Sequence, residues 1–254
     1  HYLTEVIEPI ENRLKEIMVG QRHVIKRVVQ GLFAVGQRDF NSNGERFLGV
    51  GHVLNECGTG TGKTVLCKAL GCLLSAVNNR VQGVPDGVPA DITGNEIILL
   101  TGDTKTIKGP IFCNVLLADE INRWPPKVQA GFNQALAEGE VTLGGITYRL
   151  NNPFFCLATQ NPTEQKGISR LQEALLDRFI LCLVFNETTR EEKVLIEEKT
   201  RNFHPELFGK IVDTATIDEV REFLFDNTYL SHEASGCVAK LITAVNHYQK
   251  FNLF

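Results

Sequence analysis

One short segment constrains the possible folds of this chain more than any other, the glycine-rich run CGTGTGKT at residues 57–64. It follows the apolar residues 50–54 and precedes a helical pattern that begins VLCKALGCLL. In a strand–loop–helix unit of this kind, glycines let successive backbone N–H groups point at one phosphate, and the helix N-terminus adds partial positive charge. The segment therefore predicts an α/β domain with a phosphate-binding loop (P-loop).

The side chains of this loop are expected to divide the contacts with ATP or ADP. Lys63 would direct its ammonium group to the β- and γ-phosphates, and the Thr64 hydroxyl would reach Mg²⁺. Cys57 replaces the first glycine of the usual G-x-x-x-x-G-K-[ST] pattern. The alternative is a glycine-rich turn that binds nothing, which the flanking strand and helix disfavour. Besides Lys63 and Thr64, the expected nucleotide contacts are Gly58, Thr59, Gly60, Thr61, Gly62 and Val65.

A second motif places two acids at the end of an apolar run, VLLADE at residues 115–120. Ligands of open α/β sheets bind at the carboxyl ends of the strands, so both acids are candidates for the site. Asp119 is expected to hold Mg²⁺, and Glu120 to act as the general base that polarises the attacking water. The alternative is a strand end with two solvated acids, which the preceding P-loop disfavours.

Two further polar residues lie beside short apolar runs. Asn161 follows the run at 154–158 and could hydrogen-bond the γ-phosphate or the water, although Asn-Pro also commonly opens a turn. Arg178 precedes the run at 180–185, where it could simply cap the preceding helical segment. Its functional interpretation is an arginine finger, which stabilises charge in a neighbouring subunit's site as the phosphoryl group leaves.

The periodicity along the chain predicts two domains. Helices are expected over 4–18 and 22–37, followed by a polar surface loop at 38–49. Short apolar runs between helical segments then indicate a parallel sheet covered on both faces. Gly144-Gly145, inside the alternating segment 140–150, predicts a β-hairpin. Beyond 186–188 only helical patterns remain, at about 189–202, 216–226 and 232–250, the first with Thr188 or Thr189 and Glu192 as a capping box.

Composition limits the ligands and the location. With 26 basic and 30 acidic residues, four Tyr and one Trp, the chain offers little phosphate-binding or base-stacking surface for nucleic acid. No apolar run of about 18 residues occurs, which excludes a transmembrane helix. The seven cysteines form no CxxC pair, so we expect reduced, mostly buried thiols and a cytoplasmic location. Because the chain opens with His1 and lacks an apolar signal-peptide core, we expect a shortened form of a cytoplasmic protein.

In their order, these motifs resemble those of the AAA+ ATPases, and longer stretches resemble the MoxR family. The resemblance extends from about Val19 to Glu192, roughly two thirds of the chain. The stretches that carry it are VPADITGNE at 88–96, GPIF at 109–112, DEINRWPPKVQ at 119–129, PFFCLATQNPTEQKG at 153–167 and LLDRF at 175–179.

The resemblance implies a fold and a division into domains. Residues 1–187 are expected to form a three-layer αβα P-loop NTPase (AAA+) domain with a parallel central sheet, and residues 188–254 a small all-α lid. No Gly-x-Ser-Pro-Arg segment occurs before Phe254, so we expect this lid to be cut short and its sensor 2 arginine to be missing. The hairpin at 140–150 and the segment 96–109 occupy the positions of the family's ring-facing insertions.

The resemblance also implies roles for single residues. Cys57 and Trp124 depart from the residues that are usual in the family. The family's motifs map onto Walker A at Lys63 and Thr64, Walker B at Asp119 and Glu120, sensor 1 at Asn161, the arginine finger at Arg178, and the residues that flank the adenine at Val19 and Gly20.

The implied activity is Mg²⁺-dependent ATP hydrolysis at the subunit interfaces of a ring, usually a hexamer. Such a ring remodels or matures client proteins, often with a partner that contains a von Willebrand factor A-type domain. Two other functions stay open on the residues alone. A nucleic-acid motor on the same core is disfavoured by the acidic composition, and a nucleotide-gated scaffold with little turnover is disfavoured by the joint presence of Glu120, Asn161 and Arg178.

Overall fold

The computed structural model describes residues 1–40, 46–56, 60–161, 170–185, 189–201 and 209–229, with Ser231, Glu233 and Cys237. The chain divides into two compact units, His1–Arg221 and Glu222–Phe254. Helix α8 (Thr214–Asn227) crosses this division. Its residues 214–221 belong to the first unit and its residues 222–227 to the second. The expected boundary between residues 187 and 188 stays a prediction.

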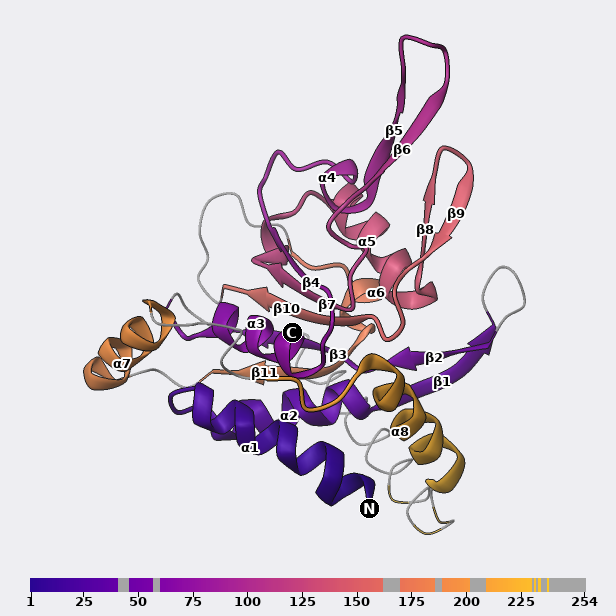
Figure 1. Cartoon of the computed structure of the whole chain (residues 1–254). Coiled ribbons are helices and arrows are strands. Elements are labelled where there is room, and N and C mark those ends of the chain that lie inside the picture. Colours follow the sequence, from indigo (N-terminus) through magenta and orange to yellow (C-terminus); the bar gives the residue numbers. More distant parts are fainter. Residues whose placement is uncertain are drawn as a thin grey trace, which may run out of the picture. The chain divides into compact units, whose positions relative to one another are not determined.

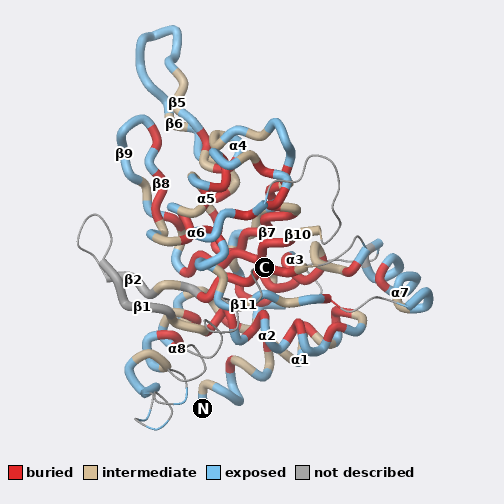
Figure 2. The backbone as a smooth tube through the Cα atoms, turned by 180° about the vertical axis from the view of Figure 1, so that it is seen from behind, coloured by how far each residue is buried: buried red, intermediate tan, exposed pale blue. Residues whose placement is uncertain are grey.

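A five-stranded parallel sheet forms the centre of the first unit, with the strand order β11-β3-β10-β7-β4. This confirms the parallel sheet that the short apolar runs predicted. The three central strands β3, β10 and β7 are buried along most of their length, whereas the edge strands β11 and β4 are partly exposed (Figure 2). Their bounds are β3 (His52–Glu56), β4 (Asn78–Gln82), β7 (Val115–Asp119), β10 (Phe155–Gln160) and β11 (Phe179–Val184).

Helices cover both faces of this sheet, which gives the expected three-layer α/β/α architecture (Figure 1). One layer contains α1 (Glu8–Ile17), α2 (Arg22–Phe33) and α3 (Lys63–Leu73), with a π-helical turn at Leu3–Ile7 before α1. The opposite layer contains α4 (Ala90–Thr93) and α5 (Pro126–Glu138). Trp124 packs in this second layer, edge to face against Phe132 with ring centroids 5.0 Å apart.

Three antiparallel hairpins accompany the sheet. The predicted hairpin is confirmed as β8 (Glu140–Leu143) and β9 (Ile146–Arg149), joined by two glycines with positive φ. The segment 96–109 overlaps a second hairpin, β5 (Gly94–Ile98) and β6 (Thr104–Lys108), whose strands were not predicted. The third is formed by β1 (Val35–Phe40) and β2 (Arg46–Val50).

The third hairpin shows that the predicted surface loop at 38–49 was wrong. Residues 38–40 and 46–49 pair as antiparallel strands, and only 41–45 lie outside the described residues. Turn-forming residues are concentrated in the middle of the stretch, at 41–44 (NSNG), and they dominated the sequence interpretation. The same strand ends α2 at Phe33 and not at residue 37, because residues 35–37 already belong to β1.

The helices after the sheet agree in part with the sequence. In α7 (Arg190–Arg201) the capping box is confirmed at Thr189, whose N–H donates to Glu192 Oε2 at 2.9 Å while its hydroxyl accepts the Glu192 N–H at 3.1 Å. Helix α8 corresponds to the segment predicted at 216–226. The helix predicted at 232–250 lies outside the continuously described residues.

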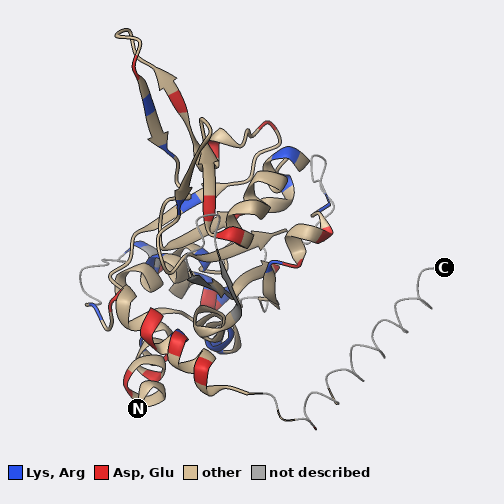
Figure 3. Ribbon diagram, turned by 90° about the vertical axis from the view of Figure 1, so that its right-hand side faces the viewer, with Lys and Arg blue, Asp and Glu red and all other residues tan. Residues whose placement is uncertain are grey.

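Acidic and basic side chains are interspersed along the described chain (Figure 3). Among the described cysteines, Cys67, Cys113 and Cys156 are buried and all are free thiols, as expected, but Cys182 and Cys237 are exposed. Cys182 is exposed because β11 is an edge strand on which every second residue faces outward. No helix in the described part of the chain is both long and apolar enough to span a membrane.

Candidate functional site

The P-loop joins the end of β3 to the beginning of α3. Gly60 and Gly62 have φ values of 78° and 84°, which favour glycine because side chains with a Cβ rarely adopt them. Gly62 is the residue before α3, so the unpaired N–H groups of the first helical turn face the loop. The predicted contacts Gly58 and Thr59 lie outside the described residues, as does Cys57.

Lys63 lies at the start of α3 and forms an ion pair across the sheet edge, with its Nζ 2.8 Å from Asp119 Oδ1. Its side chain is only 13% exposed. Two predicted site residues that are 56 positions apart are therefore in direct contact. The ammonium group is held close to the end of β7, where a phosphate could replace the carboxylate as its partner.

The Asp119 carboxylate is held from three directions at the end of β7. Besides Lys63, the Thr159 hydroxyl donates to Oδ1 at 2.6 Å and Arg80 donates to Oδ2 at 2.7 Å. Burial alone would raise the pKa of the Asp119 carboxyl, but these three hydrogen bonds outweigh it and hold the pKa below its ordinary value. Asp119 is therefore an ionised carboxylate at neutral pH.

Glu120 follows Asp119 in a left-handed backbone conformation, with φ 55° and ψ 47°. Its Oε1 accepts a hydrogen bond from the Asn161 side-chain amide at 3.3 Å, and its Oε2 lies 3.0 Å from an Arg123 nitrogen. Asn161 is held in turn, because its backbone carbonyl accepts a hydrogen bond from the side-chain amide of Asn122 at 3.1 Å. The structure thus brings the predicted base and the predicted amide together at the ends of neighbouring strands.

Arg178 lies elsewhere in the first unit. It precedes β11, whose residue Phe179 pairs with His52 at the beginning of β3, whereas the P-loop follows the end of β3. Because the strands are parallel and rise roughly 3.3 Å per residue, Arg178 lies at the opposite edge of the sheet from the P-loop. The side chain is exposed, and its Nε donates to Asn133 of α5 at 3.2 Å.

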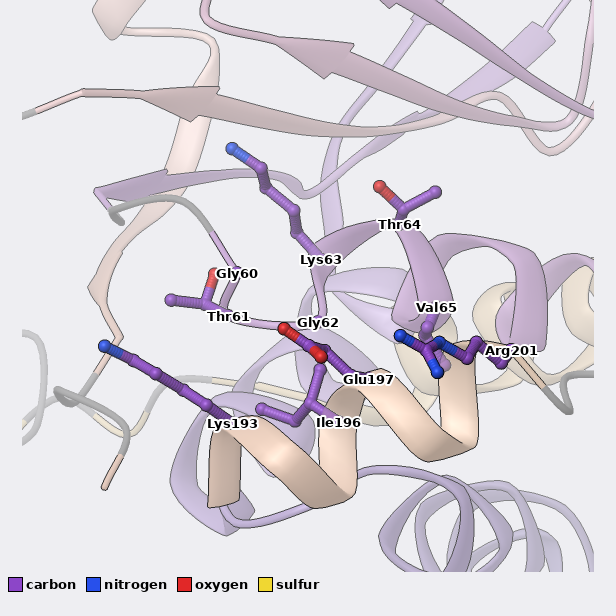
Figure 4. A pocket seen from close by; sticks show the side chains of 10 residues that line it. All are labelled: Gly60, Thr61, Gly62, Lys63, Thr64, Val65, Lys193, Ile196, Glu197 and Arg201. Atoms are coloured by element: carbon purple, nitrogen blue, oxygen red, sulfur yellow. The ribbon is translucent and has the colours of Figure 1, made fainter. Parts of the chain in front are cut away.

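A cavity of about 780 Å³ separates the P-loop from α7. Its walls are residues 60–65 on one side and Lys193, Ile196, Glu197 and Arg201 of α7 on the other. In Figure 4 the α7 side chains Lys193, Ile196 and Glu197 extend toward Thr61 and Gly62. This size is in the range of small-molecule sites.

The segment with Val19 and Gly20 approaches the same cavity. A Cβ at Gly62 would lie 3.1 Å from Met18 Cε, and a Cβ at Gly20 would lie 2.9 Å from Glu192 on α7. Lys199 of α7 donates to the carbonyls of Glu16 and Ile17 at the C-terminus of α1. Gly20 is therefore close to α7, and its neighbour in the chain but one, Met18, is close to the P-loop.

Comparison with known proteins decides the family. A sequence profile of the ATPase family associated with various cellular activities (AAA) matches residues 52–181, about half of the chain. Chaperone MoxR1 of Mycobacterium tuberculosis is 31% identical over 242 residues, which cover 94% of this chain and 59% of that protein. The chain belongs to the MoxR family of AAA+ ATPases.

Two further comparisons agree with this MoxR-family assignment. The uncharacterized protein YeaC of Bacillus subtilis is 40% identical over 197 residues, covering 76% of this chain and 56% of that protein. A crystal structure from Cytophaga hutchinsonii, named as a candidate ATPase, superposes with a TM-score of 0.77 at 31% identity, covering 94% of this chain and 68% of that one. The chain thus spans slightly more than half the length of the curated relatives.

Nucleotide binding is a property of this family, and the donor set fits the Mg²⁺ ion that usually accompanies the nucleotide. Mg²⁺ prefers oxygen ligands and commonly takes one or two from the protein and the rest from phosphates and water. The ionised Asp119 carboxylate and the Thr64 hydroxyl are ligands of this type. Among the described residues, no group of three or more His, Cys, Asp or Glu side chains could hold a metal ion.

Several residues of the site were missed from the sequence. Thr159, Arg80 and Arg123 were not among the predicted site residues. A polar residue at the buried end of a central strand was the one available signal for Thr159. The α7 residues gave no signal, because their helix follows the P-loop by more than 120 positions and only the tertiary fold brings the two together.

Proposed function

We propose that this chain binds ATP with Mg²⁺ between the P-loop and α7 and hydrolyses the terminal phosphate. The observation that carries the proposal is the meeting of Lys63, Asp119, Glu120 and Asn161 at one edge of the sheet. These residues come from α3, β7 and the segments after β7 and β10. Lys63 contacts Asp119 at 2.8 Å and Asn161 contacts Glu120 at 3.3 Å, and Thr159 joins the two acids through hydrogen bonds of 2.6 and 2.9 Å.

Binding would exchange the partners of Lys63. In the structure its ammonium group neutralises Asp119, and with ATP present the phosphates would take that place while Asp119 and Thr64 face Mg²⁺. Mg²⁺, when bound, supplies charge that offsets the charge of the leaving phosphoryl group. On the opposite wall, Lys193 and Arg201 offer further positive charge and Ile196 an apolar surface.

Glu120 and Asn161 would orient the attacking water. The water oxygen bonds to the γ-phosphorus while the bond from that phosphorus to the β–γ bridging oxygen breaks, and ADP leaves with the electron pair. The Glu120 carboxylate accepts the proton of the water. Arg123 competes for the same carboxylate, but its side chain is 43% exposed, and exposed ion pairs contribute little to stability.

Arg178 would complete the site of a neighbouring subunit and not that of its own chain. Its place at the opposite edge of the sheet supports this, since it cannot reach its own P-loop in the described fold. We therefore propose a ring, of six subunits as is usual for the family, that remodels client proteins together with a partner containing a von Willebrand factor A-type domain. The free thiols of the described cysteines support a cytoplasmic location.

Glu120→Gln tests the proposed hydrolysis. The variant should bind ATP as tightly as the wild-type chain in isothermal titration, because Lys63 and the P-loop are unchanged. Its turnover with Mg²⁺ should fall on the order of 100-fold or more, as expected for loss of a general base. Glu138→Gln, at an exposed position on α5, is the matched control and should change neither quantity. A wild-type chain that binds ATP but does not turn it over in an assembled ring would favour the scaffold function instead.

A further inference from the structure

Thr159 lies at a point where it contacts both acids of the site. It belongs to β10, the strand between β3, which leads into the P-loop, and β7, which carries the acids. Its side chain is 1% exposed. Its Oγ1 is 2.6 Å from Asp119 Oδ1 and 2.9 Å from the Glu120 backbone nitrogen.

The direction of both hydrogen bonds is determined by chemistry. A threonine hydroxyl has one proton, and that of Thr159 is donated to Asp119 Oδ1. The Glu120 N–H can only donate, so it uses a lone pair of the same hydroxyl oxygen. One buried hydroxyl therefore joins the side chain of one acid to the backbone of the next.

This hydroxyl continues the sheet beyond its last backbone pair. The ladder between β10 and β7 ends at Ala158 and Ala118, and the Thr159 hydroxyl then binds the Glu120 N–H in place of a backbone carbonyl. Glu120 needs such support because its left-handed backbone costs roughly 1–2 kcal/mol in a residue with a Cβ.

We propose that Thr159 is a positioning residue for ATP hydrolysis, whose hydroxyl sets the Asp119 carboxylate and the Glu120 backbone in one geometry. It touches neither nucleotide nor water and acts through the two acids. The inference rests on the proposed hydrolytic function, and it differs from the sensor role predicted for Asn161, whose side-chain amide donates to the Glu120 carboxylate.

The alternative candidate for this role is Arg123, which also contacts Glu120. Its ion pair is nearly half exposed on the arginine side, whereas the Thr159 hydroxyl is buried and binds a charged group on one side. Hydrogen bonds to buried charges are stronger than exposed ion pairs, so Thr159 is the residue with the larger effect.

Thr159→Val and Thr159→Ser test the proposal. Valine has the shape of threonine without the hydroxyl, and serine keeps the hydroxyl without the methyl group. In Thr159→Val we expect kcat with saturating Mg-ATP to fall roughly 10- to 100-fold, the usual loss when an outer partner of a catalytic or metal-binding group is removed. The dissociation constant for ATP without Mg²⁺ should stay within about twofold of wild type, because the P-loop is intact. Thr159→Ser should restore most of kcat.

A second measurement does not depend on turnover. In protein labelled with ¹⁵N-glutamate, hydrogen exchange of the Glu120 amide should be faster in Thr159→Val and close to wild type in Thr159→Ser. Thr142→Val, at an exposed position of β8, is the matched control and should leave both kcat and this exchange rate unchanged.

Three results would overturn the positioning role of Thr159. Unchanged kcat and unchanged Glu120 exchange in Thr159→Val would overturn the proposal, and so would a Thr159→Ser variant as impaired as the valine variant. Loss of Mg²⁺-free ATP binding in Thr159→Val would also overturn it, since the residue would then support the P-loop. If the wild-type chain shows no turnover in any assembled state, the proposed function fails, and the Glu120 exchange rate alone decides the role of Thr159.

Discussion

Gly83→Ala should disturb the catalytic acids from the side opposite Thr159. Gly83 follows β4, and its N–H donates to the Asp119 carbonyl at 2.6 Å. A Cβ at this position would lie 1.9 Å from the Glu120 carbonyl oxygen and 2.7 Å from the carbonyl carbon. Both atoms are backbone, so no side chain can rotate to make room.

The size of the effect follows from this contact. Real Cβ atoms essentially never approach within 3.0 Å of such an atom, so the two segments must separate by about 1 Å. A misplacement of about 1 Å in a catalytic site can cost 10²-fold in rate, and an overpacked core typically loses about 1–3 kcal/mol. We therefore expect kcat to fall on the order of 100-fold and the free energy of unfolding to fall by about 1–3 kcal/mol.

Steady-state ATP turnover and urea unfolding of the same preparation measure both quantities. Gly131→Ala is the matched control, because a Cβ there meets only a Pro89 side-chain carbon at 3.8 Å, an ordinary contact. A Gly83→Ala variant with wild-type kcat and wild-type stability would refute the reasoning, since the Glu120 backbone would then tolerate displacement.

Two further predictions concern His52 and Arg178. Burial, which outweighs the hydrogen bond to Leu136, lowers the pKa of His52 to about 4, so the folded chain resists a proton that the unfolded chain binds below about pH 6.5. The free energy of unfolding should therefore fall as pH falls from 6.5 toward 4, by about 2 kcal/mol at pH 5. Urea unfolding at pH 7 and pH 5 measures this loss, which should be smaller in His52→Gln. Arg178→Ala should abolish the rise of specific ATPase activity with protein concentration, while Arg27→Ala should preserve it; an equal loss in monomer and ring would contradict action on a neighbouring subunit.

Much of the site could be predicted because its parts are local in the chain. The P-loop was recognisable because positive-φ glycines, a lysine and the start of a helix must follow one another within eight residues. The two acids at the end of β7 and the amide after β10 were also recognisable, since polar residues at the end of an apolar strand interrupt its hydrophobic pattern. The hairpin at Gly144-Gly145 was predicted for the same reason, because its turn chemistry lies within a few residues.

The partners of these residues could not be predicted, because they depend on strand order and register. Nothing local in the chain says that β10 lies between β3 and β7, and that order alone puts the Thr159 hydroxyl against both acids. Arg80 reaches Asp119 only because β4 is the next strand, and α7 reaches the P-loop only through the fold. The sequence by itself determined the kinds of chemical group and the segments that carry them. The tertiary structure decided which groups meet, because contacts between distant segments depend on how the whole chain packs.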